Sequence, residues 1–338
     1  MAEYDQDRPV VAVTGASAGV GRAVALAFAR RGATVALMSR RRERLDSAAR
    51  EVEAAGGLAM VESVDVSDAA AVEAAAARIA SVCGRIDVWI NCAMVTVFAP
   101  VRDLRPDEVR RVTEVTYLGQ VHGTLAALRH MRPRDSGTIV QVGSALAYCS
   151  IPLQSAYCAA KAAVRGFTDS LRSELIHERS GVRVTMIQLP GIDTPQFDWA
   201  RSRLPRQLQP VPPIYDPEAV AERIVKAAAT APRELWIGTS AMKAILGTFA
   251  APGMLDRMMA DRAWDGQMTR AAAEPRADNL FDAPAGDPGA HGRFAARERH
   301  SVSAVSGDAA RWAIGLAGVA TAVGVTALAY AAGRRATR

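Results

Sequence analysis

Aromatic residues and cysteines are scarce in this chain of 338 residues. Phe, Trp and Tyr together make up only 5%, and alanine supplies much of the apolar half. The four cysteines are Cys83, Cys92, Cys149 and Cys158. None belongs to a Cys-x-x-Cys pair, and no histidine stands at metal-ligand spacing from them. We therefore expect reduced thiols, no disulfide framework and no metal site.

A basic stripe interleaved with aromatic residues is also absent, although the formal net charge is +6. The arginines are scattered over the helical patterns and the tail, so we expect no nucleic-acid partner. The N-terminal stretch MAEYDQDRP is polar and acidic and lacks the apolar core of a signal peptide. The main domain is therefore expected in the cytoplasm.

One long uncharged run stands out, the 22 residues Trp312–Gly333. As an α-helix it would extend about 33 Å, which is enough to cross a bilayer core of about 30 Å. Arginines flank it, and Trp312 and Tyr330 lie near its ends, where aromatic belts fall. The run predicts a membrane anchor over residues 311–333. The alternative is an Ala/Gly-rich helix buried in a core or dimer, which would leave the protein in the cytoplasm.

Apolar runs alternate with helical patterns over about the first 240 residues. Strands are expected at Val10–Thr14, Thr34–Ser39, Leu58–Val64, Ile86–Asn91, Thr138–Gly143, Arg183–Leu189 and Leu235–Ile237. Helices are expected at Gly21–Arg31, Arg41–Ala55, Asp68–Val82, Pro106–Met131, Ser155–Glu178 and Pro217–Ala231. The continuous apolar character of the strands indicates that both faces are covered. The alternation predicts an α/β fold with a doubly wound (Rossmann-type) parallel sheet of about seven strands.

This pattern ends at about Gly238. Ala241–Asp265 has a helical, methionine-rich pattern, and residues 269–308 are rich in Pro, Gly, Ala and charge. We expect a main domain of residues 1–240 and an extension of residues 241–310. The extension is either a linker or a segment laid over the domain surface.

A glycine-rich loop, Thr14-Gly-Ala-Ser-Ala-Gly-Val-Gly21, joins the first strand to the first helix. A helix N-terminus attracts anions, because its free N–H groups and its dipole favour negative charge. The three glycines permit a sharp turn, close approach of a pyrophosphate and close packing of the helix on the strand. A P-loop is excluded, because Gly-Lys-Ser/Thr is missing. The loop predicts a dinucleotide site with contacts at Gly15, Ser17, Gly19, Val20 and Gly21.

The end of the second strand indicates which dinucleotide binds. An NAD site usually has an acidic residue there for the ribose 2′-OH, but the chain reads Ser39-Arg40-Arg41. A guanidinium can instead pair with a 2′-phosphate through two hydrogen bonds. We expect NADP(H), with Arg40 as the main contact and Arg22 or Arg41 as helpers. The alternative is a solvated arginine cluster at the start of a helix.

Three polar residues further along form a candidate catalytic set. Ser144 follows a strand, and Tyr157 and Lys161 are four residues apart on a predicted helix, which places them on one face. A cation about 4 Å from the phenol, at an effective dielectric near 20, contributes about 4 kcal/mol. This would lower a tyrosine pKa of about 10 to near 7. Tyr157 would exchange a proton with a substrate oxygen, Ser144 would donate to that oxygen, and Lys161 would bond the nicotinamide ribose.

With these motifs the chain resembles the short-chain dehydrogenase/reductase family over about residues 8–240. The resemblance implies that Asp65 and Val66 flank the adenine and that Asn91 braces the sheet beside the cofactor. It also implies that Thr194 bonds the nicotinamide carboxamide. Family members usually pair through two long helices, expected here at Pro106–Met131 and Ser155–Glu178, so a homodimer or homotetramer is expected.

Three positions depart from the family pattern. Met94 stands where the family has a glycine beside the cofactor. Thr116 replaces an asparagine that supports a water next to the catalytic lysine, and we expect its hydroxyl to take over this catalytic role. Leu189 stands where a proline is usual, which shifts the Pro-Gly pair by one position.

The segment from Pro195 to Pro217 is long for a connection and is expected to be a substrate lid with Phe197, Trp199 and Leu204 as apolar contacts. The alternative is a surface loop whose aromatic residues dock on the core. The leading functional hypothesis is an NADP(H)-dependent oxidoreductase that interconverts a ketone or aldehyde and an alcohol, with a hydrophobic substrate. The alternative is a cofactor-binding scaffold or sensor with little turnover.

Overall fold

The computed structural model describes residues 8–312, and an eight-stranded sheet forms their centre. The strand order is β14-β11-β7-β6-β4-β1-β2-β3. The strands are β1 (Val10–Thr14), β2 (Thr34–Ser39), β3 (Leu58–Ser63), β4 (Val88–Asn91), β6 (Gly137–Val142), β7 (Val182–Gln188), β11 (Glu234–Ile237) and β14 (Ala304–Ser306). All neighbours pair in parallel except β11 and β14, which are antiparallel.

The seven strands of the main domain confirm the doubly wound sheet expected from the sequence. The eighth strand, β14, comes from the extension and was not expected, because three residues are too few for a strand pattern. The chain adds strands in one direction from β1 to β3 and in the other direction from β4 onward, so the strand order reverses between β1 and β4. In such sheets a ligand binds at the carboxyl ends of the two strands beside this reversal.

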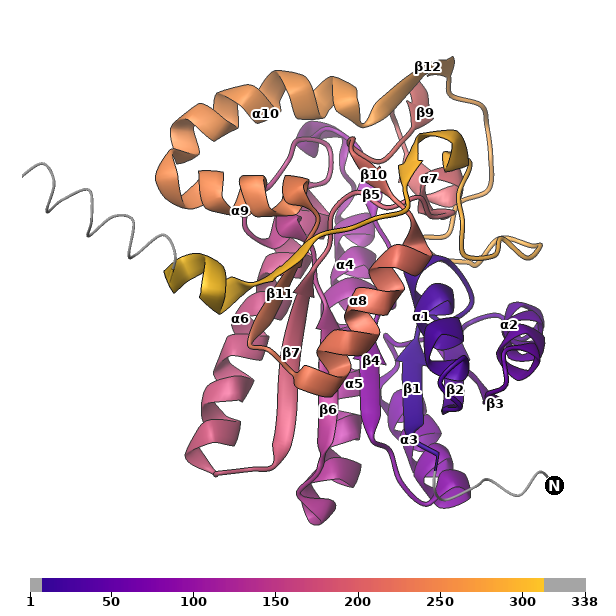
Figure 1. Cartoon of the computed structure of the whole chain (residues 1–338). Helices are drawn as coiled ribbons and strands as arrows, with labels where there is room; N and C mark the ends of the chain where they lie inside the picture. Colours follow the sequence, from indigo (N-terminus) through magenta and orange to yellow (C-terminus); the bar gives the residue numbers. More distant parts are fainter. Residues whose placement is uncertain (1–7, 313–338) are drawn as a thin grey trace, which may run out of the picture.

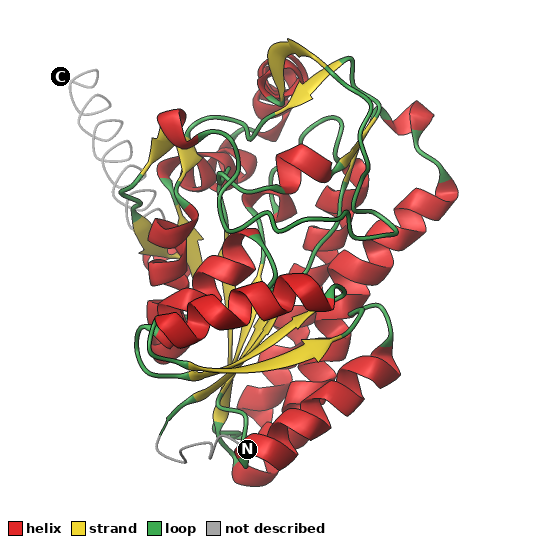
Figure 2. Ribbon diagram, turned by 90° about the vertical axis from the view of Figure 1, so that its right-hand side faces the viewer, coloured by secondary structure: helices red, strands yellow, loops and turns green. Residues whose placement is uncertain are grey.

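Helices cover both faces of the sheet (Figure 2). Val11 and Val13 of β1 pack in one apolar cluster and Val10 and Ala12 in the other, so successive side chains enter opposite layers. The first layer contains α1 (Gly19–Ala29), α2 (Arg42–Ala54) and α8 (Pro217–Thr230). The second layer contains α3 (Ala69–Cys83), α4 (Pro106–Thr113), α5 (Gly119–Met131) and α6 (Ser155–His177). Burial on both sides explains why the strands are apolar throughout.

The helix expected at Pro106–Met131 is formed, but not as one regular α-helix. A π-helical segment, η2 (Glu114–Leu118), lies between α4 and α5. Segments of this kind are often found at functional sites. Here η2 carries Thr116, one of the predicted site residues.

Short elements at the carboxyl end of the sheet complete the main domain. They are β5 (Val97–Phe98), α7 (Gln196–Trp199), β8 (Arg201–Ser202), β9 (Arg206–Leu208) and β10 (Ile214–Tyr215). β5 pairs with β8, so the predicted lid segment is tied to the end of the sheet rather than projecting from it.

The extension packs on the main domain. It begins with α9 (Thr239–Ala250), α10 (Pro252–Gly266) and β12 (Met268–Ala272) and ends with β13 (Glu298–Arg299) and β14. Between them, residues 279–291, which we name the strap, cross the carboxyl end of the sheet beside α1 and α2 (Figure 1). β13 then pairs with β10, and β14 joins the sheet edge.

Within residues 8–312, no helix is both long and apolar enough to cross a membrane. The anchor predicted at residues 311–333 lies almost wholly outside the described residues, and so does its alternative of a buried Ala/Gly-rich helix.

Candidate active site

The glycine loop has the backbone that its sequence predicted. Gly15 and Gly19 have φ values of 72° and 55°, in the left-handed region where side chains are strained. A Cβ on Gly15 would lie 2.8 Å from Cα of Ala93, and a Cβ on Gly21 would collide with the carbonyl oxygen of Gly15. Thr14 Oγ1 accepts hydrogen bonds from the backbone of Cys92 and Ala93, which joins this loop to the end of β4.

A cavity of about 460 Å³ runs along the carboxyl ends of the strands. It begins beside the second strand, passes the glycine loop and ends beyond the candidate catalytic set. The predicted site residues that line it are Gly15, Ser17, Gly19, Val20, Gly21, Arg40, Asp65, Val66, Ser144, Tyr157, Lys161 and Thr194. The structure therefore brings most of the predicted site into one continuous space.

Arginines gather at the first end of this cavity, and carbonyl groups of the strap hold them. Arg40 donates to the carbonyl oxygens of Asn279 and Phe281 at 2.8 and 2.7 Å. Arg41 donates to Ala283, and Arg44, which the sequence analysis did not single out, donates to the carbonyls at 284 and 286. The arginines are thus ordered beside the cavity and not a solvated cluster.

Two polar atoms at the same end are buried without a hydrogen-bond partner among the described residues. They are Ser39 Oγ and Asn279 Oδ1, a hydroxyl at the end of β2 and an amide oxygen of the strap. Asn279 and Ala283 also line the cavity, so the strap forms part of its wall. A bound group in the cavity could form hydrogen bonds with both atoms.

Arg22 and Asp65 are held by other side chains. Arg22 does not line the cavity; its buried guanidinium pairs with Glu51 and Asp287. Burial alone would raise the pKa of Asp65, but hydrogen bonds from Arg111 and a neighbouring serine bring it below its usual value. Asp65 therefore stays ionised beside the cavity.

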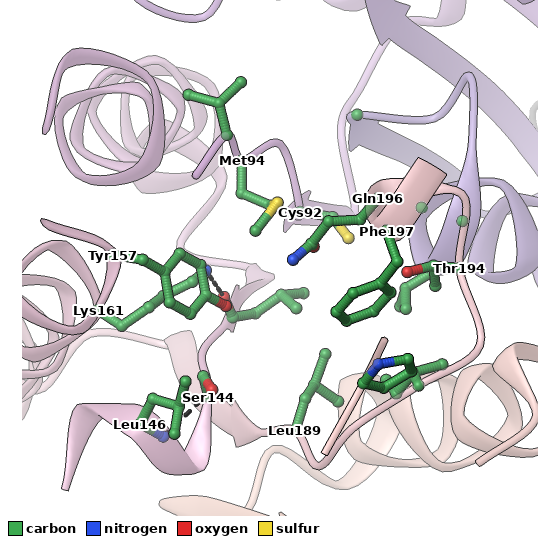
Figure 3. A pocket seen from close by; sticks show the side chains of 18 of the residues that line it. Cys92, Met94, Ser144, Leu146, Tyr157, Lys161, Leu189, Thr194, Gln196 and Phe197 are labelled. Atoms are coloured by element: carbon green, nitrogen blue, oxygen red, sulfur yellow. Dashed lines mark hydrogen bonds between the residues drawn. The ribbon is translucent and has the colours of Figure 1, made fainter. Parts of the chain in front are cut away.

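Ser144, Tyr157 and Lys161 converge at the other part of the cavity (Figure 3). Ser144 lies beside Tyr157, and its Oγ accepts a hydrogen bond from the backbone N–H of Leu146 at 3.2 Å. Lys161 lies one turn along α6, with Nζ 5.7 Å from the centre of the Tyr157 ring. It donates to the carbonyl oxygen of Val142 at 2.6 Å. The predicted shared helix face is confirmed.

Burial changes the protonation expected for this set. Desolvation raises the pKa of Tyr157, and the neighbouring Ser144 hydroxyl offsets only part of the rise. Desolvation also lowers the pKa of Lys161 to about 8. For the protein's own groups, the expected phenol pKa near 7 is therefore wrong. That expectation counted the attraction between the two charges but not the cost of removing both from water.

Asn91 and Thr116 do not line the cavity. Asn91 is fully buried; it donates to Gln141 Oε1 and accepts from Trp89 Nε1, which braces β4 within the sheet. The Thr116 hydroxyl donates to the Val95 carbonyl at 2.8 Å and accepts from its N–H at 3.0 Å. The hydroxyl thus holds the Val95 backbone with its proton and one lone pair, and the expected water-supporting role of Thr116 beside Lys161 stays a prediction.

The far end of the cavity is apolar and is built largely by the extension. Ser240, Ala241, Ala244, Met259 and Ala263, from α9 and α10, line it. No motif in the sequence marks these residues, and the one signal for them is the methionine-rich helical pattern after the expected end of the main domain. Met94 and Leu189, two of the three departures from the family pattern, also line the cavity, as does Cys92 (Figure 3).

The predicted lid residues contact both the cavity and an apolar cluster of the core. Phe197 and Trp199 line the cavity, and Arg44 stacks with its guanidinium carbon 4.8 Å from the centre of the Trp199 ring. Leu204 does not line the cavity but packs with Phe98 and Phe197 in one apolar cluster. The segment therefore both contacts the cavity and docks on the core.

Comparison with known proteins gives a consistent family. A family profile described as short chain dehydrogenase matches residues 9–204. The uncharacterized oxidoreductase YxnA of Bacillus subtilis is 35% identical over 281 residues, which cover 82% of this chain and 79% of that protein. Human dehydrogenase/reductase SDR family member 7 is 36% identical over 177 residues, 51% of this chain and 52% of the human one.

Solved structures have the same fold. A short-chain dehydrogenase from Streptomyces avermitilis superposes with a TM-score of 0.65 at 29% identity, covering 73% of this chain and 94% of the other. An alcohol dehydrogenase from the archaeon Thermococcus sibiricus, complexed with 5-hydroxy-NADP, superposes with a TM-score of 0.59 at 26% identity. It covers 68% of this chain and 96% of the other.

Proposed function

The chain belongs to the short-chain dehydrogenase/reductase family, and on this premise we propose that it is an NADP(H)-dependent oxidoreductase that interconverts a ketone or aldehyde and an alcohol. One observation carries the proposal. A single cavity connects the arginines at the end of β2 with Ser144, Tyr157 and Lys161. A dinucleotide and a small carbonyl compound can share a space of this kind.

The residues present fit the cofactor. The glycine loop leaves room where a Cβ would collide, and Ser39 Oγ and Asn279 Oδ1 are buried without partners at the arginine end. Arg40, assisted by Arg44, would hold the 2′-phosphate, and Thr194 the nicotinamide carboxamide. The archaeal relative in complex with 5-hydroxy-NADP supports the choice of NADP over NAD. When bound, the nicotinamide supplies or accepts the hydride.

The chain's own residues would handle the proton. Because burial raises the pKa of Tyr157, its side chain is a neutral phenol at physiological pH, which is the form that donates a proton to a carbonyl oxygen. Ser144 would donate a second hydrogen bond to that oxygen as its charge grows. The charged Lys161 would then stabilise the phenolate that remains. This arrangement favours carbonyl reduction.

The substrate is proposed to be hydrophobic. Phe197 and residues of α9 and α10 form a mainly apolar end beyond Tyr157, and the polar side chains there, such as Ser240 and Gln267, carry no charge to pair with a charged compound. We also propose a homodimer or homotetramer, because Val109, Leu125 and Ile176 are exposed apolar residues on α4, α5 and α6. Cytoplasmic placement of the main domain and the anchor at residues 311–333 stay predictions.

Replacement of Tyr157 by Phe tests the enzyme assignment. In the wild-type protein we expect NADPH oxidation with a panel of apolar ketones and aldehydes, and tighter binding of NADPH than of NADH. Tyr157→Phe should lower the rate by about 10²–10⁴-fold, the usual contribution of a positioned acid. Its NADPH affinity, measured by fluorescence titration, should change less than about twofold, because only one oxygen is removed.

Tyr215→Phe is the matched control, since Tyr215 is buried and does not line the cavity. Its rate should match that of the wild type. If the wild-type protein binds NADPH but turns over no compound of the panel, the scaffold hypothesis replaces the enzyme assignment.

A further inference from the structure

A cluster of carboxylates and imidazoles lies where the end of the strap meets the main domain, outside the catalytic set. Asp193, Asp216 and Glu218 come from the main domain, and His291 and Glu298 come from the extension. Ligand atoms of Asp193, His291 and Glu298 all lie within 4.8 Å of one another. Residues far apart in the sequence thus bring carboxylate oxygens and imidazole nitrogens, which are possible metal ligands, close together.

Asp193 differs from the other buried acids of residues 8–312, because no arginine or lysine compensates its charge. In the described part of the chain, the buried carboxylate residues are Glu62, Glu108, Asp193 and Glu234. The three glutamates each form an ion pair with an arginine. Asp193 forms none with Arg or Lys within residues 8–312; it accepts only from the backbone N–H of Phe294.

The other carboxylates of the cluster also pair with histidines instead of arginines or lysines in the described part of the chain. Over residues 8–312, Asp216, Glu218 and Glu298 form ion pairs with His291 and His300 but with no arginine or lysine. This is unusual in a chain that has 41 Lys and Arg residues against 35 Asp and Glu. Carboxylates removed from water require a cation close by.

One carboxylate oxygen of Glu298 lacks a hydrogen-bond partner among the described residues. Its side chain is only 5% exposed, and Oε2 is buried without a hydrogen-bond donor. This oxygen lies 3.6 Å from His291 Nδ1, while Nε2 of the same ring lies 2.7 Å from Glu218 Oε2. If Nε2–H donates to Glu218, two lone pairs, on Nδ1 and Oε2, face each other. A proton or a metal ion between the two atoms would remove this repulsion.

We propose that Asp193, His291 and Glu298 bind a divalent transition-metal ion of the Zn²⁺ type. Imidazole combined with carboxylates suits such an ion. Two ligands held about 2.1 Å from a tetrahedral ion are roughly 3.4 Å apart, close to the separation of Nδ1 and Oε2. Glu218 then has the role of the outer carboxylate that orients a metal-bound imidazole.

A second possible set of ligands, Asp216, Glu218 and His291, overlaps with the first. In this set His291 would bind the ion through Nε2 instead of Nδ1. The unpartnered oxygen of Glu298 favours the first arrangement. The ion would fasten the end of the strap to the loop that carries Thr194, and so would help to hold the wall of the cavity in place. The proposal does not depend on the enzyme assignment.

Metal titration tests the site directly. The full chain is purified with a tag that contains no histidine, stripped with a chelator, and titrated with Zn²⁺ by calorimetry and with Co²⁺ by visible absorption. We expect one ion per chain at micromolar or lower concentration. Glu298→Gln, which keeps the side-chain shape, and His291→Ala should each weaken binding at least tenfold.

Glu174→Gln and His177→Ala, at exposed positions of α6, are the matched controls and should bind the ion as the wild type does. Absence of Zn²⁺ binding at millimolar concentration would overturn the proposal, and so would unchanged binding by Glu298→Gln and His291→Ala; a proton then bridges Nδ1 and Oε2. Should these variants not fold, X-ray absorption of the Zn²⁺-loaded wild type decides. A zinc ion coordinated by one imidazole and carboxylate oxygens would support the site. A spectrum without an imidazole ligand would exclude it.

Discussion

Lys161 is a buried cation whose charge depends on pH near neutrality. Its side chain is 1% exposed, and burial lowers its pKa to about 8 from the ordinary 10.5. Between these values the unfolded chain binds more protons than the folded one, so stability rises with pH. Below pH 8 the protein therefore carries the cost of burying an ammonium group. Such a cost is common where a residue serves binding or catalysis rather than stability.

The same titration should appear in cofactor binding. Because the charged lysine attracts an anionic dinucleotide, we expect the dissociation constant for NADPH to rise by up to roughly tenfold between pH 7 and pH 9 as Lys161 loses its proton. Lys161→Met should bind NADPH more weakly at pH 7 but with little change across this range. Fluorescence titration at several pH values measures both. An equal pH dependence in the two proteins would show that another group titrates.

At the scale of elements, the strap is the least expected feature. The backbone N–H of Gly19, at the start of α1, donates to the carbonyl oxygen of Gly289 at 3.1 Å. Asp287 is anchored by Arg22 and Ser47, and although burial alone would raise the pKa of Asp287, these contacts lower it to about 2. The strap thus contacts the helix N-terminus where the sequence indicated a phosphate, and it covers the arginine end of the cavity.

Asp287→Asn should loosen the strap without changing its shape. The charge that pairs with Arg22 is lost, so we expect amide hydrogen exchange over residues 279–291 to become several-fold faster and NADPH to dissociate faster. Since the folded pKa lies below the ordinary 3.8, the wild-type contact is complete above about pH 4 and is lost as the pH falls toward 2. Glu53→Gln, at an exposed position of α2, should leave exchange in the strap unchanged.

At the scale of the whole molecule, the extension completes the central sheet. β14 covers the edge of β11, and Arg311 pairs with Glu234 at 2.5 Å. The Glu234 side chain is only 2% exposed and also accepts from Tyr148 and Gln188. The end of the described chain therefore supplies the cation that neutralises a buried carboxylate of the main domain.

Removal of that cation should destabilise the whole protein. For Arg311→Ala we expect a loss of about 2–3 kcal/mol, less than for a fully buried pair because Arg311 is one-third exposed. Thermal unfolding followed by circular dichroism should show a midpoint roughly 5–10 °C lower. Adding Glu234→Gln should recover part of the loss. Arg42→Ala, which breaks an exposed pair with Asp46, should leave the midpoint almost unchanged.

Several features followed from the sequence because their causes are local. β1 and β2 were predicted with their observed bounds, since continuous apolar runs between polar turns determine a strand covered on both faces. The glycine loop followed from the space and backbone angles that only glycine permits. Tyr157 and Lys161 share a face because four residues make about one helical turn.

Other features depend on contacts between distant segments, and only the tertiary structure decided them. The strap meets Arg40 across some 240 residues of sequence, and Asp193 meets His291 and Glu298 across about 100. The protonation of Tyr157 depends on how completely the folded chain excludes water, which spacing along a helix does not report. Local pattern thus determined the sheet and the positions of the reactive groups. The surroundings of those groups, and with them their charges, arose from long-range packing.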